Sequence, residues 1–137
     1  MGLDMYLNAE RYFGYGEAAP MVESITVKSV RAEAAYWRKA NQIHQWFVEK
    51  VQDGEDECRE HFVSREQLQE LIRQCEMVLQ DPNKAKDLLP TQSGFFFGGT
   101  DYDEWYLSQL RDTVKQLTEA LQKFPEDKWD FYYRSSW

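Results

Sequence analysis

Acidic side chains gather in two short stretches of this sequence, and carboxylates are common metal ligands. Residues 53–57 read DGEDE, and residues 101–104 read DYDE. A calcium-binding loop spaces its carboxylates at alternate positions and keeps its glycine for the sixth. Gly54 follows the first aspartate directly, so this order fails. Asp101 and Asp103 could hold the metal of a hydrolase, but carboxylates are also expected at a helix start. We expect no metal site and no cofactor.

Nucleophilic catalysis would need a reactive side chain beside a base, and the sequence gives little sign of one. Cys58 and Cys75 lack the paired spacing of zinc ligands, and they could meet His44 or His61 only through the fold. Cys75 falls on the apolar stripe of a predicted helix, where a free cysteine packs as a small hydrophobe. The sequence has no serine-elbow, zinc-protease or phosphate-loop motif. We therefore expect a protein that is not an enzyme.

Aromatic and basic residues are mixed in the run YWRKANQIHQW, residues 36–46. Rings that stack, beside cationic donors, can bind a nucleotide or a phosphate. The alternative is that the tryptophan packs in the core while the charges are solvated. The candidate ligand-binding residues are Trp37, Arg38, Lys39, Asn41 and His44.

Three consecutive phenylalanines stand between glycines in LPTQSGFFFGGTDYDEWY, residues 89–106. In an extended chain, Phe95 and Phe97 point to one side and Phe96 to the other. The segment then belongs either to the core or to an exposed aromatic patch of the kind that anchors protein interfaces. The candidate protein-binding residues are Phe96, Asp101, Tyr102, Asp103, Glu104 and Trp105, and Glu55 and Asp56 extend the ring of carboxylates.

Length and composition are those of one folded domain over residues 1–137. The chain is 42% hydrophobic and 15% aromatic, which supplies a core and argues against disorder. Its net charge of −8 repels nucleic acid and favours either a basic protein partner or simply solubility. The sequence shows no signal peptide and no apolar run of ~18 residues, so we expect a cytosolic protein without a membrane partner.

Apolar and polar residues alternate in three segments, which predicts strands at 2–8, 24–30 and 128–134, with a short strand at 61–63. Helical spacing predicts three helices. The first covers 32–51, and the second begins after Ser64, which forms a capping-box pattern with Gln67, and ends at Asp81-Pro82. The third begins at Thr100 or Asp101 and ends before Pro125.

The third predicted helix carries apolar residues at heptad spacing. Such a seam is used either inside the domain or in a homodimer. The seam consists of Leu107, Leu110, Val114, Leu117, Leu121 and Phe124. The order of elements predicts an α+β fold, in which a small, mainly antiparallel sheet has the three helices packed on one face. The first and last strands should be neighbours, because each needs a partner for its backbone groups.

Five segments carry a resemblance to a known family: MGLDMYL, AYWRKANQIHQWFV, QDGEDECREHFVSREQL, LLPTQSGFFFGGTDYDEWY and DFYYRSSW. Over nearly its whole length the chain resembles a family of small proteins encoded by phages and prophages. The resemblance implies a setting in the host cell cytosol. It assigns no activity and no catalytic residue, and residues 13–23 match none of its motifs. Small acidic proteins in that setting resemble inhibitors of host defence, which is an argument by association.

Two functions from different classes follow as expectations. The first is a phage-type protein that binds and inhibits a host protein, such as a CRISPR-Cas defence complex, without contacting nucleic acid directly. The second is a protein that binds or sequesters a nucleotide signal. A metal-dependent hydrolase is a weaker third expectation.

Overall fold

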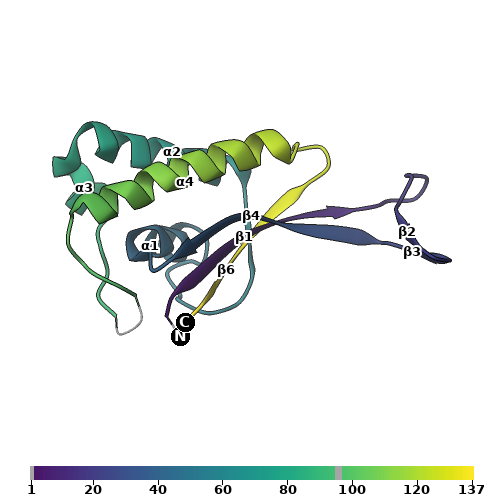
Figure 1. Ribbon diagram of the computed structural model, residues 1–137, viewed down its shortest axis with the longest axis horizontal. Coiled ribbons are helices and arrows are strands. Elements are labelled where there is room, and N and C mark those ends of the chain that lie inside the picture. The colour runs from purple at the N-terminus through teal and green to yellow at the C-terminus, as the bar shows by residue number, and fades with distance from the viewer. Residues whose placement is uncertain (1, 95–96) are drawn as a thin grey trace.

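The two ends of the chain form neighbouring strands of one antiparallel sheet (Figure 1). The structure is a computed structural model, and it describes residues 2–94 and 97–137. In the four-stranded sheet the strand order is β4-β1-β6-β5. The bounds are Asp4–Tyr12 for β1, Ser29–Arg38 for β4, His61–Val63 for β5 and Asp130–Ser136 for β6. The predicted pairing of the first and last strands is therefore confirmed, although both strands extend beyond their predicted ends.

Helices cover one face of this sheet, so the class is α+β as predicted. Figure 1 shows α2 and α4 side by side above the strands, and the two helices are in contact. The bounds are Asn41–Lys50 for α1, Arg65–Gln80 for α2, Ala85–Leu88 for the short α3 and Glu104–Lys123 for α4, with a 3-10 turn at Pro82–Lys84. The predicted capping box of α2 is present, because Ser64 Oγ accepts from the Gln67 amide at 3.1 Å and Gln67 Oε1 accepts from the Ser64 amide at 2.9 Å.

The core lies between the helices and the sheet. Strand side chains that face the helices, such as Leu7 and Tyr133, are fully buried. In the seam of α4, Leu110 and Leu117 are also fully buried, and the other seam residues are half-buried against the same core: Leu107, Val114, Leu121 and Phe124. The seam packs inside one chain, so a homodimer through it would rely on its half-buried members and stays a prediction.

The prediction of a helix over residues 32–51 is wrong in its first part. Residues Ser29–Arg38 form β4, and the helix begins only at Asn41. The register between β1 and β4 shifts between Leu7 and Asn8, which leaves Ala34 without an opposite residue. This bulge interrupts the alternation of apolar and polar residues that marks a strand. The remaining spacing of apolar residues then imitates a helix.

Other predicted boundaries also change. The strand expected at 24–30 is split between β3, Ile25–Thr26, and the start of β4. β3 pairs with β2, Met21–Val22, in a small second sheet. The helix expected to start at Thr100 or Asp101 starts after Asp103, whose side chain accepts from the Tyr106 amide. Three residues of a type that caps helices, Thr100, Asp101 and Asp103, stand within four positions. Residue type alone therefore did not identify which of them caps α4.

Candidate functional site

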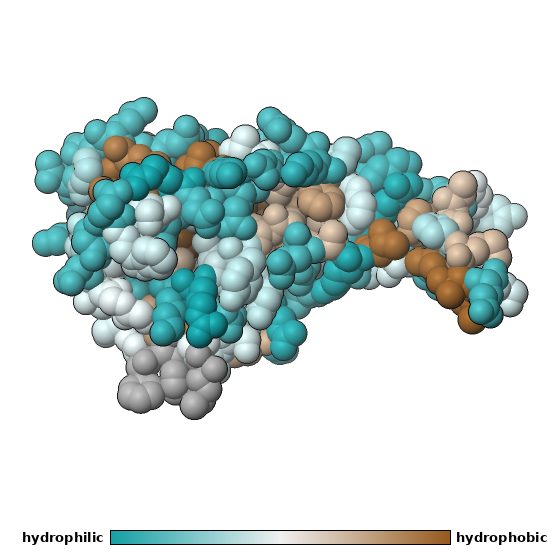
Figure 2. Space-filling view, viewed as in Figure 1, coloured by the Kyte–Doolittle hydropathy of each residue, from teal (hydrophilic) through white to brown (hydrophobic). Residues whose placement is uncertain are grey.

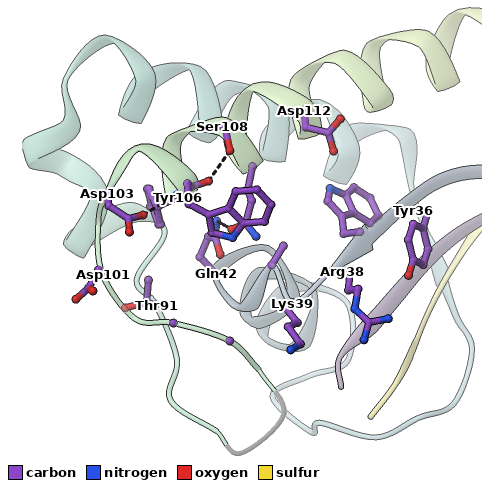
Figure 3. Close-up of a pocket in the computed structure, with 16 residues that line it drawn as sticks. Tyr36, Arg38, Lys39, Gln42, Thr91, Asp101, Asp103, Tyr106, Ser108 and Asp112 are labelled. Atoms are coloured by element: carbon purple, nitrogen blue, oxygen red, sulfur yellow. Dashed lines mark hydrogen bonds between the residues drawn. The ribbon is translucent and has the colours of Figure 1, made fainter. Parts of the chain in front are cut away.

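A cleft of about 630 Å³ opens between the end of β4 and the N-terminal half of α4 (Figure 3). Its third wall is the loop that joins α3 to α4. The cleft brings together residues from both candidate sets of the sequence, which lie about 65 positions apart. The lining residues are Tyr36, Trp37, Arg38, Lys39, Ala40, Gln42, Thr91, Gly98, Gly99, Asp101, Asp103, Trp105, Tyr106, Ser108, Gln109 and Asp112.

Hydrogen bonds from α4 fix the position of β4 along the cleft. β4 lies at the edge of the sheet, where backbone groups need other partners. The Gln116 side chain supplies them, accepting from the Tyr36 amide and donating to the Tyr36 carbonyl, both at 2.9 Å. One residue on, the Trp37 indole donates to Thr113 Oγ1 at 2.9 Å. The separation of β4 and α4 is thus set by specific bonds.

The floor of the cleft consists of buried polar groups that already have partners. Gln42 donates to Gln109 across α1 and α4 at 2.9 Å. The Tyr106 hydroxyl donates to the Leu89 carbonyl at 2.7 Å. Burial raises the pKa of the Tyr106 phenol above its usual range, so this group stays a neutral donor. These groups of the floor are therefore uncharged and already hydrogen-bonded within the chain.

The loop wall is held by one buried side chain, Asn41. Its amide nitrogen donates to the carbonyls of Phe97 and Gly99 at 3.0 and 2.8 Å, and its oxygen accepts from the Gln92 amide at 2.9 Å. At Gly98, φ is +86°, and an added Cβ would lie 3.1 Å from the Lys39 Cβ. Only a residue without a side chain lets the loop pass so close to β4 in this conformation.

Charged side chains of both signs line the cleft, and Asp112 of α4 lies on the same side as Tyr36. Figure 3 shows Arg38 beside Tyr36 at one side and Asp101 with Asp103 at the other, with Lys39 below and between them. Arg38 contacts Asp4 at 3.5 Å, whereas no ion pair involves the Lys39 side chain within the described residues. Trp105 lines the cleft with 67% of its surface exposed. The Lys39 ammonium and the Trp105 ring thus keep a contact surface that the described residues do not use.

The carboxylates of the cleft differ in how far they are engaged. Asp103 caps α4 through one oxygen, and Asp112 accepts from Gln116 at 2.9 Å. Asp101 has no hydrogen bond to any part of the chain that the structure describes. Asp101 is thus the carboxylate with the most capacity for an external donor.

His44 is itself buried and lies in a different cluster, between the buried Tyr133 and the exposed Asp56. Its Nδ1 lies 2.7 Å from the Tyr133 hydroxyl and its Nε2 lies 2.8 Å from Asp56. Burial lowers the pKa of His44, and the nearby Asp56 carboxylate opposes this shift only in part. A neutral imidazole that accepts from Tyr133 and donates to Asp56 fits both distances. Trp137 also donates to Asp56, at 3.1 Å.

The candidate binding residues predicted from the sequence do not form a single site. The cleft collects Trp37, Arg38, Lys39, Asp101, Asp103 and Trp105, whereas Asn41 and His44 serve the loop wall and the interior. Glu104 points to Arg111 in an ion pair, and Glu55 and Asp56 are not among the described lining residues. Tyr102 is 37% exposed and its hydroxyl accepts from the Thr91 amide. Phe96 and its neighbour Phe95 lie outside the described residues, and Phe97 is half-buried against the core.

Several lining residues were missed by sequence reasoning. Gln42, Gln109 and Asp112 occupy polar positions of helices, where they look like ordinary surface residues. One signal was available: Thr113 is a polar residue on the inner side of α4, between two seam leucines, and its hydroxyl bonds both Trp37 and the Gln109 carbonyl. A buried polar residue beside an apolar seam marks a helix that contacts a polar partner.

Two further observations limit the chemistry of the described residues. Within residues 2–94 and 97–137, no three histidine, cysteine or acidic side chains come close enough together to hold a metal ion. Asp101 and Asp103 therefore lack a third ligand in the part of the chain that the structure describes. Among the same residues, no helix has the length and hydrophobicity needed to cross a bilayer.

Comparison of the chain with known protein families, with curated proteins and with solved structures gave no match. The geometry of the cleft is therefore the basis for assigning a function.

Proposed function

We propose that the cleft binds a small dipolar ligand of the nucleotide class, and that the protein binds or sequesters a nucleotide signal. The observation that carries this proposal is the cleft itself, in which Arg38 and Lys39 lie apart from Asp101 and Asp103, a third carboxylate, Asp112, lines the α4 side, and a tryptophan is largely exposed. Its volume of about 630 Å³ falls within the range of ligand pockets, roughly 300–1,000 Å³.

Each part of a nucleotide has a matching group in the cleft. Arg38 and Lys39 would bind the phosphate, since charge-assisted hydrogen bonds to phosphate are short and strong. Trp105 offers an exposed ring for stacking of the base. Asp101 would accept from an amino group of the base. A ligand that carried only one of these parts would use only one side of the cleft.

A thermal-shift screen tests this proposal with nucleoside monophosphates, cyclic nucleotides and cyclic dinucleotides as probes. A ligand at 100 times its Kd stabilises the folded protein by about 2.7 kcal/mol, which raises the melting temperature measurably. We expect a nucleotide to bind more tightly than its nucleoside or inorganic phosphate alone, because it uses both sides of the cleft. The absence of a shift with every nucleotide would refute the proposal.

Matched variants locate the binding. Lys39→Gln removes the charge while keeping much of the length of the side chain, and it leaves the backbone cost at φ 55° unchanged. Lys115→Gln removes an equal charge from an exposed position of α4 that does not line the cleft. Affinity for a bound nucleotide should fall about tenfold in the first variant, if one charge-assisted bond contributes ~1.5 kcal/mol, and should stay unchanged in the second.

A second candidate function is the binding of a host protein, and the exposure of Trp105 and Tyr102 favours it. Both rings are exposed, at 67% and 37%, and they stand among Asp101, Asp103 and Glu104. Exposed aromatics ringed by charge are common anchors of protein interfaces. In the phage setting that the sequence resemblance implies, the partner would be a basic host protein in the cytosol, such as the nucleic-acid-binding complex of a CRISPR-Cas system, and the outcome would be inhibition.

Binding to candidate host complexes by the variant Trp105→Ala/Tyr102→Ala tests the second function. We expect the double variant to lose binding, while Phe62→Ala, an exposed ring at 57% on β5, keeps it. Because complementary charge would speed the encounter, the rate of association should also fall with added salt. Equal binding by the double variant and the control would exclude these rings as anchors.

A further inference from the structure

Two carboxylates line the cleft close to Trp105, and their chemistry bears on which base the cleft would bind. They belong to Asp101 and Asp103. Asp103 uses one oxygen to cap α4, and Asp101 has no hydrogen bond to any part of the chain that the structure describes. A carboxylate accepts hydrogen bonds and donates none. These two side chains therefore favour a ligand edge that consists of donors.

The chain is held in place on both sides of Asp101. The Thr91 hydroxyl donates to the Thr100 carbonyl at 2.9 Å, and the Thr91 amide donates to the Tyr102 hydroxyl at 3.1 Å. The Tyr102 ring also packs edge to face on Tyr106, with the ring centroids 5.1 Å apart. Asp101 thus stands on a preformed wall, so a ligand that binds its carboxylate orders little additional backbone.

Trp105 lies close to both carboxylates along the chain. It is the second residue of α4 and follows shortly after Asp101 and Asp103. Consecutive Cα atoms are ~3.8 Å apart, so the Cα atoms of Asp103 and Trp105 are separated by about 7.6 Å at most. A base that stacks on the exposed indole can therefore bring its polar edge to these carboxylates.

The surface near these carboxylates is polar. In Figure 2 the described part of the loop between α3 and α4 shows mainly hydrophilic and neutral side chains. Strongly hydrophobic side chains gather instead at the far end of the molecule, over β2 and β3. A hydrophobic pocket distinguishes similar ligands weakly, whereas a site that hydrogen-bonds its ligand rejects analogues without the matching group. The choice of base should therefore depend on hydrogen bonds to the carboxylates.

We propose that the cleft selects guanine and that Asp101 recognises this base, a choice that rests on the proposed nucleotide function. Guanine carries two donors side by side on its pairing edge, the N1–H group and the N2 amino group. The two oxygens of one carboxylate can accept from both donors at once, in the bidentate geometry that carboxylates also use with arginine. The free oxygen of Asp103 adds a further acceptor beside them.

The other bases match a carboxylate less well. Adenine and cytosine place one amino donor beside a ring nitrogen that only accepts, and uracil places its single N–H between two carbonyls. Each of these bases would turn a lone pair toward a carboxylate oxygen, which is electrostatically unfavourable. Arg38 and Lys39 lie apart from the two carboxylates, so a guanine nucleotide bound in this way can direct its phosphate to the cations.

Calorimetric titration of the full chain with the 5′-monophosphates of guanosine, inosine, adenosine and xanthosine tests this proposal. Inosine lacks only the N2 amino group, so its monophosphate should bind about tenfold more weakly than that of guanosine. Adenosine monophosphate should bind more weakly still. Asp101→Asn should lower the affinity for guanosine monophosphate about tenfold and raise that for xanthosine monophosphate, because the asparagine amide donates to the carbonyl that replaces the amino group. Glu104→Gln removes an equal charge from a residue that pairs with Arg111 outside the cleft, and it should change neither affinity.

The possible failures of guanine recognition and of nucleotide binding are distinguishable. Equal affinity for guanosine and adenosine monophosphates would overturn guanine recognition and leave nucleotide binding intact, whereas no binding of any nucleotide would refute both. A preference for guanosine that persists in Asp101→Asn would exclude Asp101 as the recognising residue; its side chain is exposed, so the variant should fold. Equal affinity for guanosine and inosine monophosphates, with weaker binding of 2′-deoxyguanosine monophosphate, would assign the carboxylates to the ribose hydroxyls and overturn the proposal.

Discussion

The cleft and the cluster around the buried His44 start from the same stretch of chain and use their polar groups in opposite ways. Trp37 and Arg38 end β4, Lys39 follows them, and all three line the cleft, whereas His44, the fourth residue of α1, points into the interior. In the interior, both imidazole nitrogens have partners within the chain. In the cleft, the side chains of Lys39 and Asp101 have no polar partner among the described residues.

The difference teaches how to separate structural polar groups from functional ones in this fold. A buried polar group costs free energy unless it is hydrogen-bonded, so the His44 cluster is completed from inside the chain. Groups that keep spare capacity in a concave site remain available to a ligand. Substitutions in the interior should therefore lower stability, and substitutions in the cleft should lower binding.

The largest expected effect is on stability, from Phe47→Ala. Phe47 is fully buried and stacks on Tyr133 with ring centroids 3.9 Å apart. Removal of a buried phenylalanine ring costs about 3–5 kcal/mol, through lost burial and the cavity left behind. Trp105→Ala in the cleft should change the free energy of unfolding by ~0.5 kcal/mol or less, as exposed positions do. Urea denaturation of both variants measures the contrast, and comparable losses would contradict it.

Asn41→Ala should have the next largest effect, because it removes the clamp on the loop wall. The substitution leaves two carbonyls and one amide of residues 92–99 without their partner. We expect the free energy of unfolding to fall by about 1–3 kcal/mol. The loop should also lose protection against amide hydrogen exchange, while the buried strands keep theirs. Unchanged exchange at Gln92 would show that the clamp does not hold the wall.

Asp103→Ala should lower the free energy of unfolding by a smaller amount, about 1 kcal/mol, because it removes the cap of α4. Asparagine also caps helices, so Asp103→Asn should retain most of the stability while lowering the negative charge of the cleft. The two variants thus separate the structural role of Asp103 from its role in the site. Thermal denaturation compares them, and equal losses in both would rule out the capping role.

The smallest expected change is in the pH dependence of stability. Burial lowers the pKa of His44 below its ordinary value near 6.5, so the unfolded chain takes up a proton first as the pH falls. The contribution of neutral His44 to the free energy of unfolding is therefore fully present above about pH 6.5. It is lost as the pH falls from there through the lower pKa of the folded state. His44→Phe should flatten this part of the curve. A slope retained in His44→Phe would assign it to other groups.

Much of the fold could be predicted from the sequence because local patterns agreed with the tertiary structure. The capping box at Ser64 and the heptad seam of α4 act within single helices, so their residues identify them. The pairing of β1 with β6 followed from the need of terminal strands for partners. These helices and strands were sufficient to predict the α+β class.

The cleft could not be predicted because it depends on contacts between distant segments. The bulge at Ala34 interrupts the strand pattern, so β4 was not predicted from the sequence. The turn at Lys39, which places Trp37 and His44 in different sites, was therefore not predicted either. Both candidate sets of residues were recognised by type, but nothing local shows that β4 and α4 are held together by Gln116. The role of Asn41 likewise depends on a loop more than fifty residues away.

The central claim is that a nucleotide occupies the cleft, and the indole N–H signals of the five tryptophans test it most directly. In a two-dimensional ¹H–¹⁵N NMR titration with the best-binding nucleotide, we expect the signals of Trp105 and Trp37 to shift. The signals of Trp46, Trp129 and Trp137, which do not line the cleft, should stay in place. A titration that shifts those three signals and leaves Trp105 and Trp37 unchanged would contradict the account.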